Sequence, residues 1–286
     1  MAAEPRLAPY ARLPSAYQGR DVLHSTVDAF GRAHWLLRDS ARRGNAYDAL
    51  LVTVEGGHDR TTRLRSVHAR FPRVDALPDG AFVVADARRQ DGVDQVQVFD
   101  SSGRSSYGFD VGDAIEHLLT DESGDLWVGH FDEGVGSDPL CDPGLRCWSR
   151  AGEPLWQYHQ PSEAGWFLDC YALNVDRRCT LAYPYTDFPL LEVRSRGQAR
   201  IRTTPVRGAK GVVVHGPRVA LYGGYGDEHD RLLLGSLTDS AVEPVEETRL
   251  LRADGARSGR RRVVCRGPRL YVQEEPGIDW ALYDIG

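Results

Sequence analysis

The sequence of 286 residues contains no apolar run long enough to cross a membrane. A membrane-spanning helix needs about 20 consecutive apolar residues, and polar or charged side chains interrupt every hydrophobic stretch here well before that length. The first residues, MAAEPRLAPYARLPSAYQGR, also lack the apolar centre of a secretory signal. We therefore expect a cytoplasmic chain with no membrane partner.

Cysteine and lysine are also in short supply. The formal net charge of −6 argues against a broad nucleic-acid-binding surface, and Lys210 is the only lysine. No phosphate-binding glycine loop, G-x-S-x-G nucleophile elbow or Cys-x-x-Cys pair occurs. An odd number of cysteines at irregular spacing forms no disulfide framework; they are Cys141, Cys147, Cys170, Cys179 and Cys265.

What the sequence does contain is a repeated phrase. Residues 71–85 read FPRVDALPDGAFVVA, and residues 115–129 read IEHLLTDESGDLWVG. In each copy an apolar run, a turn with Asp and Gly, and a second run rich in aromatic and aliphatic residues precede a loop and two further short strands. A period of roughly 40–50 residues built in this way is typical of a β-propeller blade.

The repeat predicts an all-β fold with very little helix, arranged as one six-bladed propeller domain of four-stranded antiparallel blades. The last repeat lacks a fourth strand, so we expect an N-terminal strand within residues 5–20 to complete it and close the ring. Seven blades is the alternative. The expected blades span 22–69, 70–112, 113–161, 163–208, 209–254 and 255–286.

The third copy resembles the repeats of two-component-regulator-type propellers, which carry the phrase D-x-x-G-x-L-W-V-G. The second copy is similar to NHL-like or bacterial WD40-like blades, through LPDGAFVVA and VFDSSG. This resemblance implies the fold and says little of function, because propellers host hydrolases, lyases, oxidoreductases and pure binding modules. The matching residues of the third copy are Asp121, Gly124, Leu126, Trp127, Val128 and Gly129.

Polar loops that follow the second strand of each repeat are the first candidate site. Carboxylates and histidines there predict a face for a protein or small-molecule ligand, with a divalent cation as an option, although no EF-hand or zinc spacing is present. The alternative is solvated loops whose Asp side chains bond their own backbone. The candidates are His130, Asp132, Glu133, Tyr185, Asp187, Tyr225, Asp227 and His229.

The starts of the first strands are the second candidate site, because alignment brings basic or titratable residues to equivalent positions there. In a central channel they would hold a small anion, or they would pair with nearby carboxylates as internal salt links. Glu116, Asn174 and Asp75 are similar to the Glu, Asn and Asp that hold a divalent metal in gluconolactonase-like propellers. The channel candidates are His24, Arg73, Glu116, His117, Asp169, Asn174, Lys210 and Arg261.

A regular repeat without a catalytic motif favours a non-catalytic binding module that uses the loop face. Two alternatives stay open. One is a hydrolase or lyase acting on a sugar or lactone, with or without a divalent metal; the other is a sensor that binds a small anion in the channel. We predict no cofactor, and the sequence assigns no catalytic residue.

Overall fold

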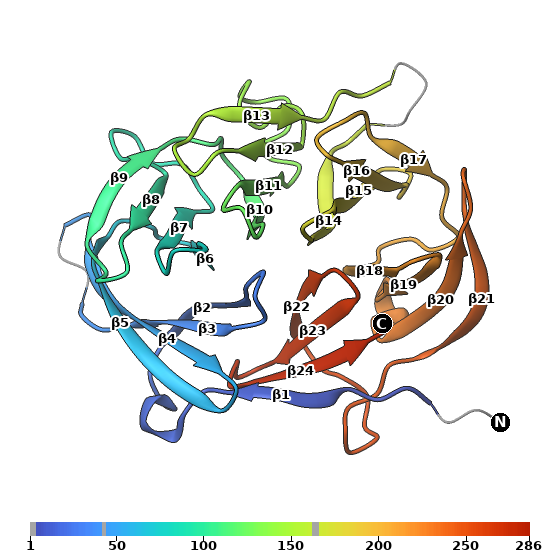
Figure 1. Ribbon diagram of the computed structural model, residues 1–286, viewed down its shortest axis with the longest axis horizontal. Coiled ribbons are helices and arrows are strands. Elements are labelled where there is room, and N and C mark those ends of the chain that lie inside the picture. Colours follow the sequence, from blue (N-terminus) through green and yellow to red (C-terminus); the bar gives the residue numbers. More distant parts are fainter. Residues whose placement is uncertain (1–3, 42–43, 162–165) are drawn as a thin grey trace. The chain divides into compact units, whose positions relative to one another are not determined.

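The computed structural model describes residues 4–41, 44–161 and 166–286 (Figure 1). Residues 42–43 of the first expected blade and the start of the fourth, at 163, lie outside these ranges. Within them the chain forms β-strands and two short 3₁₀ turns, η1 (Ser15–Tyr17) and η2 (Gly226–Glu228), and no α-helix. The prediction of an all-β fold with very little helix is therefore confirmed.

The structure divides into two compact units, which we call the N-terminal unit (residues 11–159) and the C-terminal unit (residues 160–286 with 1–10). The N-terminal unit contains three antiparallel sheets of four strands, each in chain order. They are β2 (Val22–Val27), β3 (Ala33–Arg38), β4 (Tyr47–Glu55) and β5 (His58–Val67); β6 (Pro72–Ala76), β7 (Phe82–Asp86), β8 (Val96–Phe99) and β9 (Ser105–Phe109); and β10 (Ile115–Thr120), β11 (Leu126–His130), β12 (Leu145–Trp148) and β13 (Pro154–Gln157).

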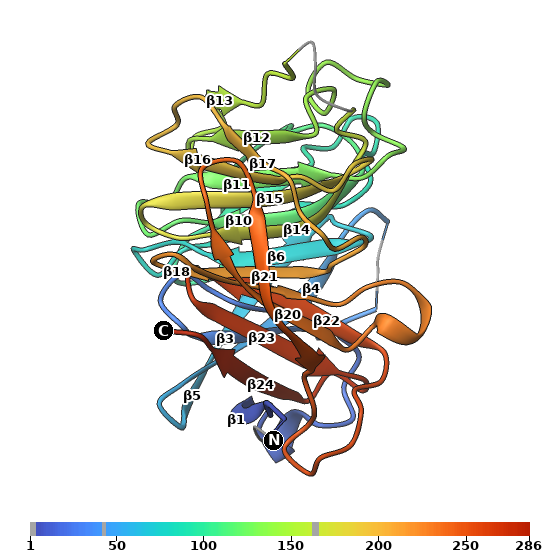
Figure 2. The same ribbon diagram turned by 90° about the vertical axis from the view of Figure 1, so that its right-hand side faces the viewer.

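The C-terminal unit contains a four-stranded sheet and an eight-stranded sheet ordered β1-β24-β23-β22-β14-β15-β16-β17. One parallel bridge, Asn174 to Cys265, joins the halves of the larger sheet. Strand β1 lies next to β24 (Figure 2). The strands are β1 (Ala8–Arg12), β14 (Asp169–Val175), β15 (Cys179–Tyr185), β16 (Leu190–Arg194), β17 (Arg200–Arg202), β18 (Gly211–His215), β19 (Arg218–Tyr222), β20 (Arg231–Leu237), β21 (Val242–Arg249), β22 (Arg261–Arg266), β23 (Arg269–Glu274) and β24 (Asp279–Asp284).

The repeated Asp-x-x-Gly phrase makes the turn between the first two strands of a sheet. At β10–β11, the Asp121 carboxylate accepts hydrogen bonds from the backbone N–H of Ser123 (2.9 Å) and of Asp125 (3.1 Å). Gly124 follows with φ +91°, a value that residues with a Cβ rarely adopt. The sequence therefore repeats this phrase because each tight turn needs both an acceptor and a glycine.

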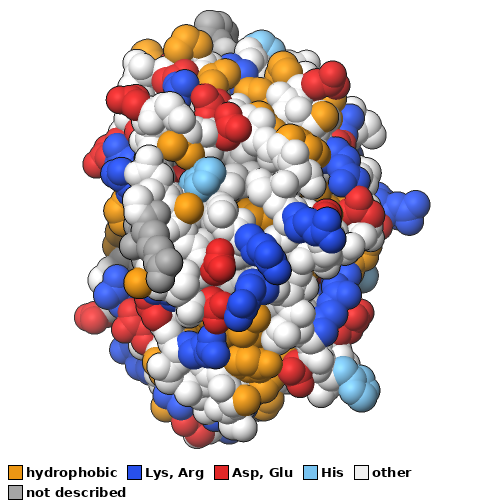
Figure 3. Space-filling view, turned by 90° about the vertical axis from the view of Figure 1, so that its left-hand side faces the viewer, with side chains coloured by type: hydrophobic (Ala, Val, Ile, Leu, Met, Phe, Trp, Pro, Cys, Tyr) orange, Lys and Arg blue, Asp and Glu red, His pale blue; other side chains and the backbone are white. Residues whose placement is uncertain are grey.

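Apolar faces of neighbouring sheets pack against each other within each unit. In the N-terminal unit, Val83 and Ala85 of β7 share a buried cluster with Leu118 of β10 and Val128 of β11. Strands β5 and β9 close their sheets on the side drawn in Figure 3, where basic and acidic side chains are interspersed. Within the N-terminal unit, neighbouring sheets thus bury apolar residues against each other, while most residues of β5 and β9 are exposed.

Two further expectations concern membrane spans and cysteines. Among the described residues, no helix is long and apolar enough to cross a membrane. All five cysteines are free thiols, and four of them are buried. The cysteines therefore serve as small apolar side chains in the packing.

Candidate functional site

Strand pairing brings the two candidate sets to the same end of each sheet. In the C-terminal unit, Asp169 at the start of β14 pairs with Tyr185 at the finish of β15, and Arg261 pairs with Glu274 in the same way. In the N-terminal unit, Arg73 pairs with Ala85. We call this end, where the first strand begins and the second strand finishes, the loop end of a sheet.

Three first strands carry a β-bulge at the loop end. The pairing register skips one residue in β2, β10 and β14, and the residues left out are Leu23, Glu116 and Tyr171. A bulge inserts an unpaired residue that bends the strand and re-aims its side chain. The first strand of the fourth repeat therefore presents a tyrosine at this position.

Tyr171 is the centre of an aromatic cluster in the C-terminal unit. Its ring centroid lies 6.2 Å from that of Tyr185, 5.1 Å from that of Phe188 and 6.1 Å from that of Tyr225. Phe188 is buried, whereas Tyr185 and Tyr225 are 38% and 52% exposed. Tyrosine rings that are half-buried in this way offer an apolar face and a polar tip to a ligand.

Cations and a hydrogen bond complete this cluster. The ammonium of Lys210 lies 3.6 Å from the ring centre of Tyr171, a cation–π contact. The Tyr225 hydroxyl donates to the Tyr171 hydroxyl at 2.9 Å. Burial and that hydrogen bond raise the pKa of Tyr171, so its phenol stays protonated.

A pocket of about 490 Å³ opens beside Lys210, within the same unit. It brings together one residue from the predicted loop face, His229, and two from the predicted channel, Lys210 and Arg261. Asp187 and Asp227 are exposed but do not line it. The lining residues are Lys210, Gly224, His229, Gly259, Arg260, Arg261 and Val263.

Asn174 holds strands together at the opposite end of β14. Its buried amide donates to the carbonyl oxygens of Val212 and Gly267, both at 2.8 Å, and accepts from the N–H of Gly267 at 2.7 Å. Both N–H donors of the side chain are used. Asn174 therefore links its own strand to the segments that contain Val212 and Gly267, which lie far away in the sequence.

In the N-terminal unit, the channel candidates bond to the neighbouring first strands. His24 Nδ1 accepts from the N–H of Val74 at 3.3 Å, and Arg73 Nε donates to the carbonyl of Glu116 at 3.2 Å. Burial lowers the pKa of Arg73, while the charge of Glu116 opposes that shift. His117, which directly follows the bulge of β10, pairs with Gly129. These contacts tie β2, β6 and β10 to one another at their loop ends.

His130 is buried, although the sequence placed it in the polar loop face. Its Nδ1 donates to the carbonyl of Asp113 at 2.8 Å. Burial lowers its pKa to about 4, so the ring is neutral at physiological pH. Asp132 beside it is exposed, and Glu133 forms an ion pair with Arg88.

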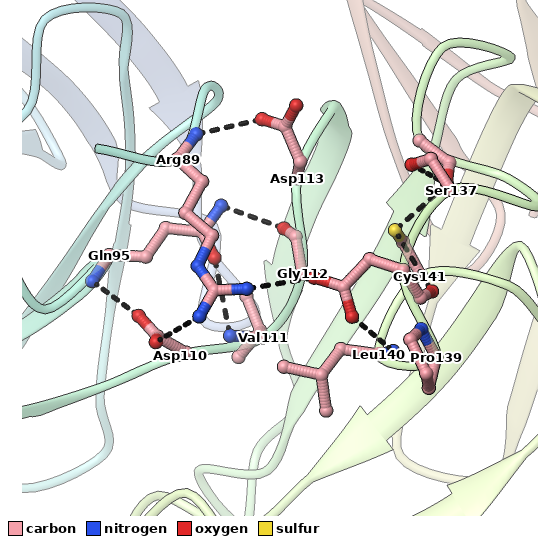
Figure 4. A network of polar contacts seen from close by, with 12 residues as sticks. Arg89, Gln95, Asp110, Val111, Gly112, Asp113, Ser137, Pro139, Leu140 and Cys141 are labelled. Atoms are coloured by element: carbon pink, nitrogen blue, oxygen red, sulfur yellow. Dashed lines mark hydrogen bonds and ion pairs between the residues drawn. The ribbon is translucent and has the colours of Figure 1, made fainter. Parts of the chain in front are cut away.

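The long loop after His130 is fixed by salt bridges that the sequence did not indicate. Arg89 pairs with Asp138 at 2.9 Å and with Asp110 at 3.1 Å, and its backbone N–H donates to Asp113 at 2.7 Å (Figure 4). The Cys141 thiol donates to the carbonyl of Gly134 at 3.0 Å. These contacts give Asp110, Asp113 and Asp138 partners within the N-terminal unit.

Sequence reasoning missed a buried polar chain in the first sheet. Asp28 contacts His34 Nε2 at 2.8 Å, and His34 Nδ1 contacts the Thr53 hydroxyl at 2.9 Å. The connectivity is that of an acid, a base and a hydroxyl, but all three side chains are buried. The described residues contain no group of three His, Cys, Asp or Glu side chains that could hold a metal ion.

Comparison with known proteins identifies the fold. No family model and no curated protein matches the sequence. Virginiamycin B lyase from Staphylococcus aureus is similar in structure, at 11% identity and TM-score 0.51, over 96% of this chain and 83% of that one. A streptogramin B lyase structure gives 8% identity and TM-score 0.53 over 91% and 78%. The β-propeller domain of the Trilobed protease from Pyrococcus furiosus gives 15% and 0.51 over 93% and 83%.

These likenesses cover nearly the whole chain, and the third structure is named a β-propeller in its own description. The chain therefore has the β-propeller fold. Identities this low carry the fold alone, because unrelated functions share such architectures.

Proposed function

We propose that this protein is a non-catalytic β-propeller binding module, and that its ligand meets the loop end of the C-terminal unit. The observation that carries the proposal is the aromatic cluster, where Tyr185 and Tyr225 stay partly exposed around Tyr171. Partly exposed aromatic rings gathered at one place on the surface favour a contact surface.

The chemistry of the cluster favours a sugar ring or a peptide as the ligand. Tyrosines give a large contact area at little cost in conformational entropy, and their hydroxyls add hydrogen bonds. Trp166, at the edge of the described residues, is 71% exposed and extends the aromatic character of this region of the sequence. We assign no cofactor, and a divalent cation stays an option for the carboxylates Asp187 and Asp227.

We also propose that six blades form one closed cytoplasmic domain. Support comes from the grouping of the strands into sets of four. The N-terminal unit has three four-stranded sheets, and the C-terminal unit has one four-stranded sheet and an eight-stranded sheet whose two halves have four strands each. Strand β1 supplies the fourth strand next to β24. Closure of this kind protects sheet edges that an open array would expose.

The test is a binding screen of the purified protein against glycan and peptide arrays. A ligand found there should bind at least about tenfold more weakly to Tyr185→Ala and Tyr225→Ala, as expected for aromatic anchors. Tyr107→Ala is the matched control, since Tyr107 is 40% exposed on β9 of the other unit. Ligands that bind all three variants equally would contradict the site.

A substrate screen separates binding from catalysis. Turnover of a sugar or lactone that is abolished by Asp132→Ala or His117→Ala would replace the proposal with the hydrolase or lyase alternative. Calcium, manganese and zinc, added separately, should leave the unfolding temperature of a metal-free binding module unchanged.

A further inference from the structure

We propose that the pocket beside Lys210 binds an oxyanion, a phosphate or a carboxylate, on a ligand whose ring lies against Tyr225. This inference rests on the proposed binding function and names the class of its ligand. The lining of the pocket is positively charged, because it includes Lys210, Arg260 and Arg261 and no acidic side chain.

Carboxylates near the lining offset these positive charges only in part: Glu274 accepts a hydrogen bond from the N–H of Gly259 at 3.0 Å, and Arg260 has an ion-pair partner. Lys210 and Arg261 contact aromatic rings, of Tyr171 and Tyr222, and in the part of the chain that the structure describes neither forms an ion pair. Arg260 pairs with Glu275 at 3.3 Å, but both side chains are well exposed, so solvent screens this pair. Converging cations repel one another, and an anion with several acceptor oxygens relieves that repulsion through charge-assisted hydrogen bonds.

The pocket has room for such a group. Its volume of about 490 Å³ lies within the range of roughly 300–1,000 Å³ that small-molecule sites occupy. Beside the backbone of Gly259 the space is open, since an added Cβ would meet nothing within 4 Å.

His229 fixes the shape of the pocket. Its Nδ1 lies 3.0 Å from the carbonyl oxygen of Gly226, and its Nε2 lies 3.1 Å from that of Ser258. The ring thus connects the loop between β19 and β20 with the segment before β22. The two backbone segments that line the pocket are therefore linked before a ligand arrives, which reduces the entropy lost on binding.

The ring of the ligand follows from what borders the pocket. Tyr225 comes directly after the lining residue Gly224, and its exposed ring contacts Tyr171, over which Lys210 lies. A ligand whose anionic group sits between Lys210 and Arg261 would meet this aromatic surface next. Stacking on the tyrosine and charge pairing would then act on two parts of one molecule.

Calorimetry at low salt with four probes tests the inference: phenyl phosphate, benzoate, inorganic phosphate and phenol. Wild-type protein should bind phenyl phosphate or benzoate, and the stronger of the two identifies the oxyanion. Lys210→Gln and Arg261→Gln should each weaken that binding at least about tenfold. Arg269→Gln is the matched control, since Arg269 lies on the same sheet and pairs with Asp284.

Unchanged binding of phenyl phosphate and benzoate in Lys210→Gln and Arg261→Gln, or no binding of either by wild type at millimolar concentration, would overturn the inference. Lys210 is exposed, so its variant reports on the site without a risk to folding. Phenol separates the two proposals. Suppose that Tyr225→Ala loses phenol binding, while Lys210→Gln and Arg261→Gln bind phenyl phosphate and benzoate as wild type does. That result would support the aromatic contact surface and contradict the oxyanion pocket.

Discussion

The ammonium of Lys210 lies 3.6 Å above the ring centre of Tyr171. Lys210, the only lysine of the sequence, thus contacts the aromatic residue among the bulge residues Leu23, Glu116 and Tyr171. The contact joins the strand β14 to the start of β18 and sets a positive charge at the border between the aromatic cluster and the pocket.

Gly208→Ala should displace the ring of Tyr225 and so weaken ligand binding. Gly208 has φ +76°, and a Cβ there would lie 2.8 Å from the Tyr225 ring, so the ring must move. We expect ligand binding to weaken about as much as in Tyr225→Ala. Gly136→Ala is the control, because Gly136 has φ +80° but nothing within 4 Å of its added Cβ. Both variants should lose about 1–2 kcal/mol of stability from the backbone alone. Equal binding by both would contradict the prediction.

Asn174→Asp should lower the free energy of unfolding by about 2–4 kcal/mol. The new carboxylate has nearly the same shape, but it would face the carbonyl oxygens of Val212 and Gly267 without a proton to donate. Urea denaturation measures the loss. Because protonation of the acid restores one donor, the defect should shrink at low pH. A stable Asn174→Asp protein at pH 7 would refute the role of this amide.

His130 should make stability fall as the pH drops from about 6.5 towards 4. The folded-state pKa of about 4 is below the ordinary value of 6.5, so the unfolded chain takes up a proton that the folded protein refuses. This group contributes stability above pH 6.5, and about 3 kcal/mol of it is lost by pH 4. His130→Gln should flatten the curve of unfolding free energy over that window. An unchanged slope would show that His130 titrates normally.

Asp28 should make the stability of the protein depend on pH over a lower pH range than His130 does. Burial alone would raise its pKa, but the hydrogen bond to His34 and the charges of His34 and Arg32 outweigh burial and hold the pKa at about 2. Stability is then present above the unfolded value near 4 and lost as the pH falls towards 2, by about 2 kcal/mol. Asp28→Asn should remove this slope between pH 4 and 2, as followed by acid titration of the intrinsic tryptophan fluorescence. The His130 window should stay unaltered in that variant.

Leu7→Ala tests the N-terminal segment. Leu7 is buried in a cluster with Leu232 and Leu250, and its N–H donates to the carbonyl of Leu251 at 2.8 Å. Removing its side chain should lower the free energy of unfolding by about 2–4 kcal/mol. Leu155→Ala, where the leucine is 37% exposed, should cost much less. Equal effects in chemical denaturation would mean that the segment does not contribute to the fold.

The sequence predicted the strands because their signals are local. The turn at Gly124 needs only the five residues from Asp121 to Asp125, and the apolar runs beside it need only their own alternation. The equivalent positions of His24, Arg73 and His117 were also predicted from the sequence alignment. In each sheet, strand pairing places this residue opposite the last part of the second strand.

Contacts between distant residues could not be predicted in this way. Asn174 depends on Val212 and Gly267, which lie 38 and 93 residues away. The loop after His130 looks exposed in sequence, because its charged partners Arg88 and Arg89 belong to the preceding sheet. The bulge at Tyr171 was hidden as well, since it is a property of pairing between two strands and not of either alone.

The bulges at Leu23, Glu116 and Tyr171 bear on how such a protein can diversify. A bulge residue stands outside the ladder of paired residues, so replacing its side chain leaves the neighbouring strand bonds intact. Three equivalent positions here already hold an aliphatic, an acidic and an aromatic residue. Mutation at these points can therefore sample new ligand chemistry while the scaffold keeps its register, which makes the bulges natural places to engineer specificity.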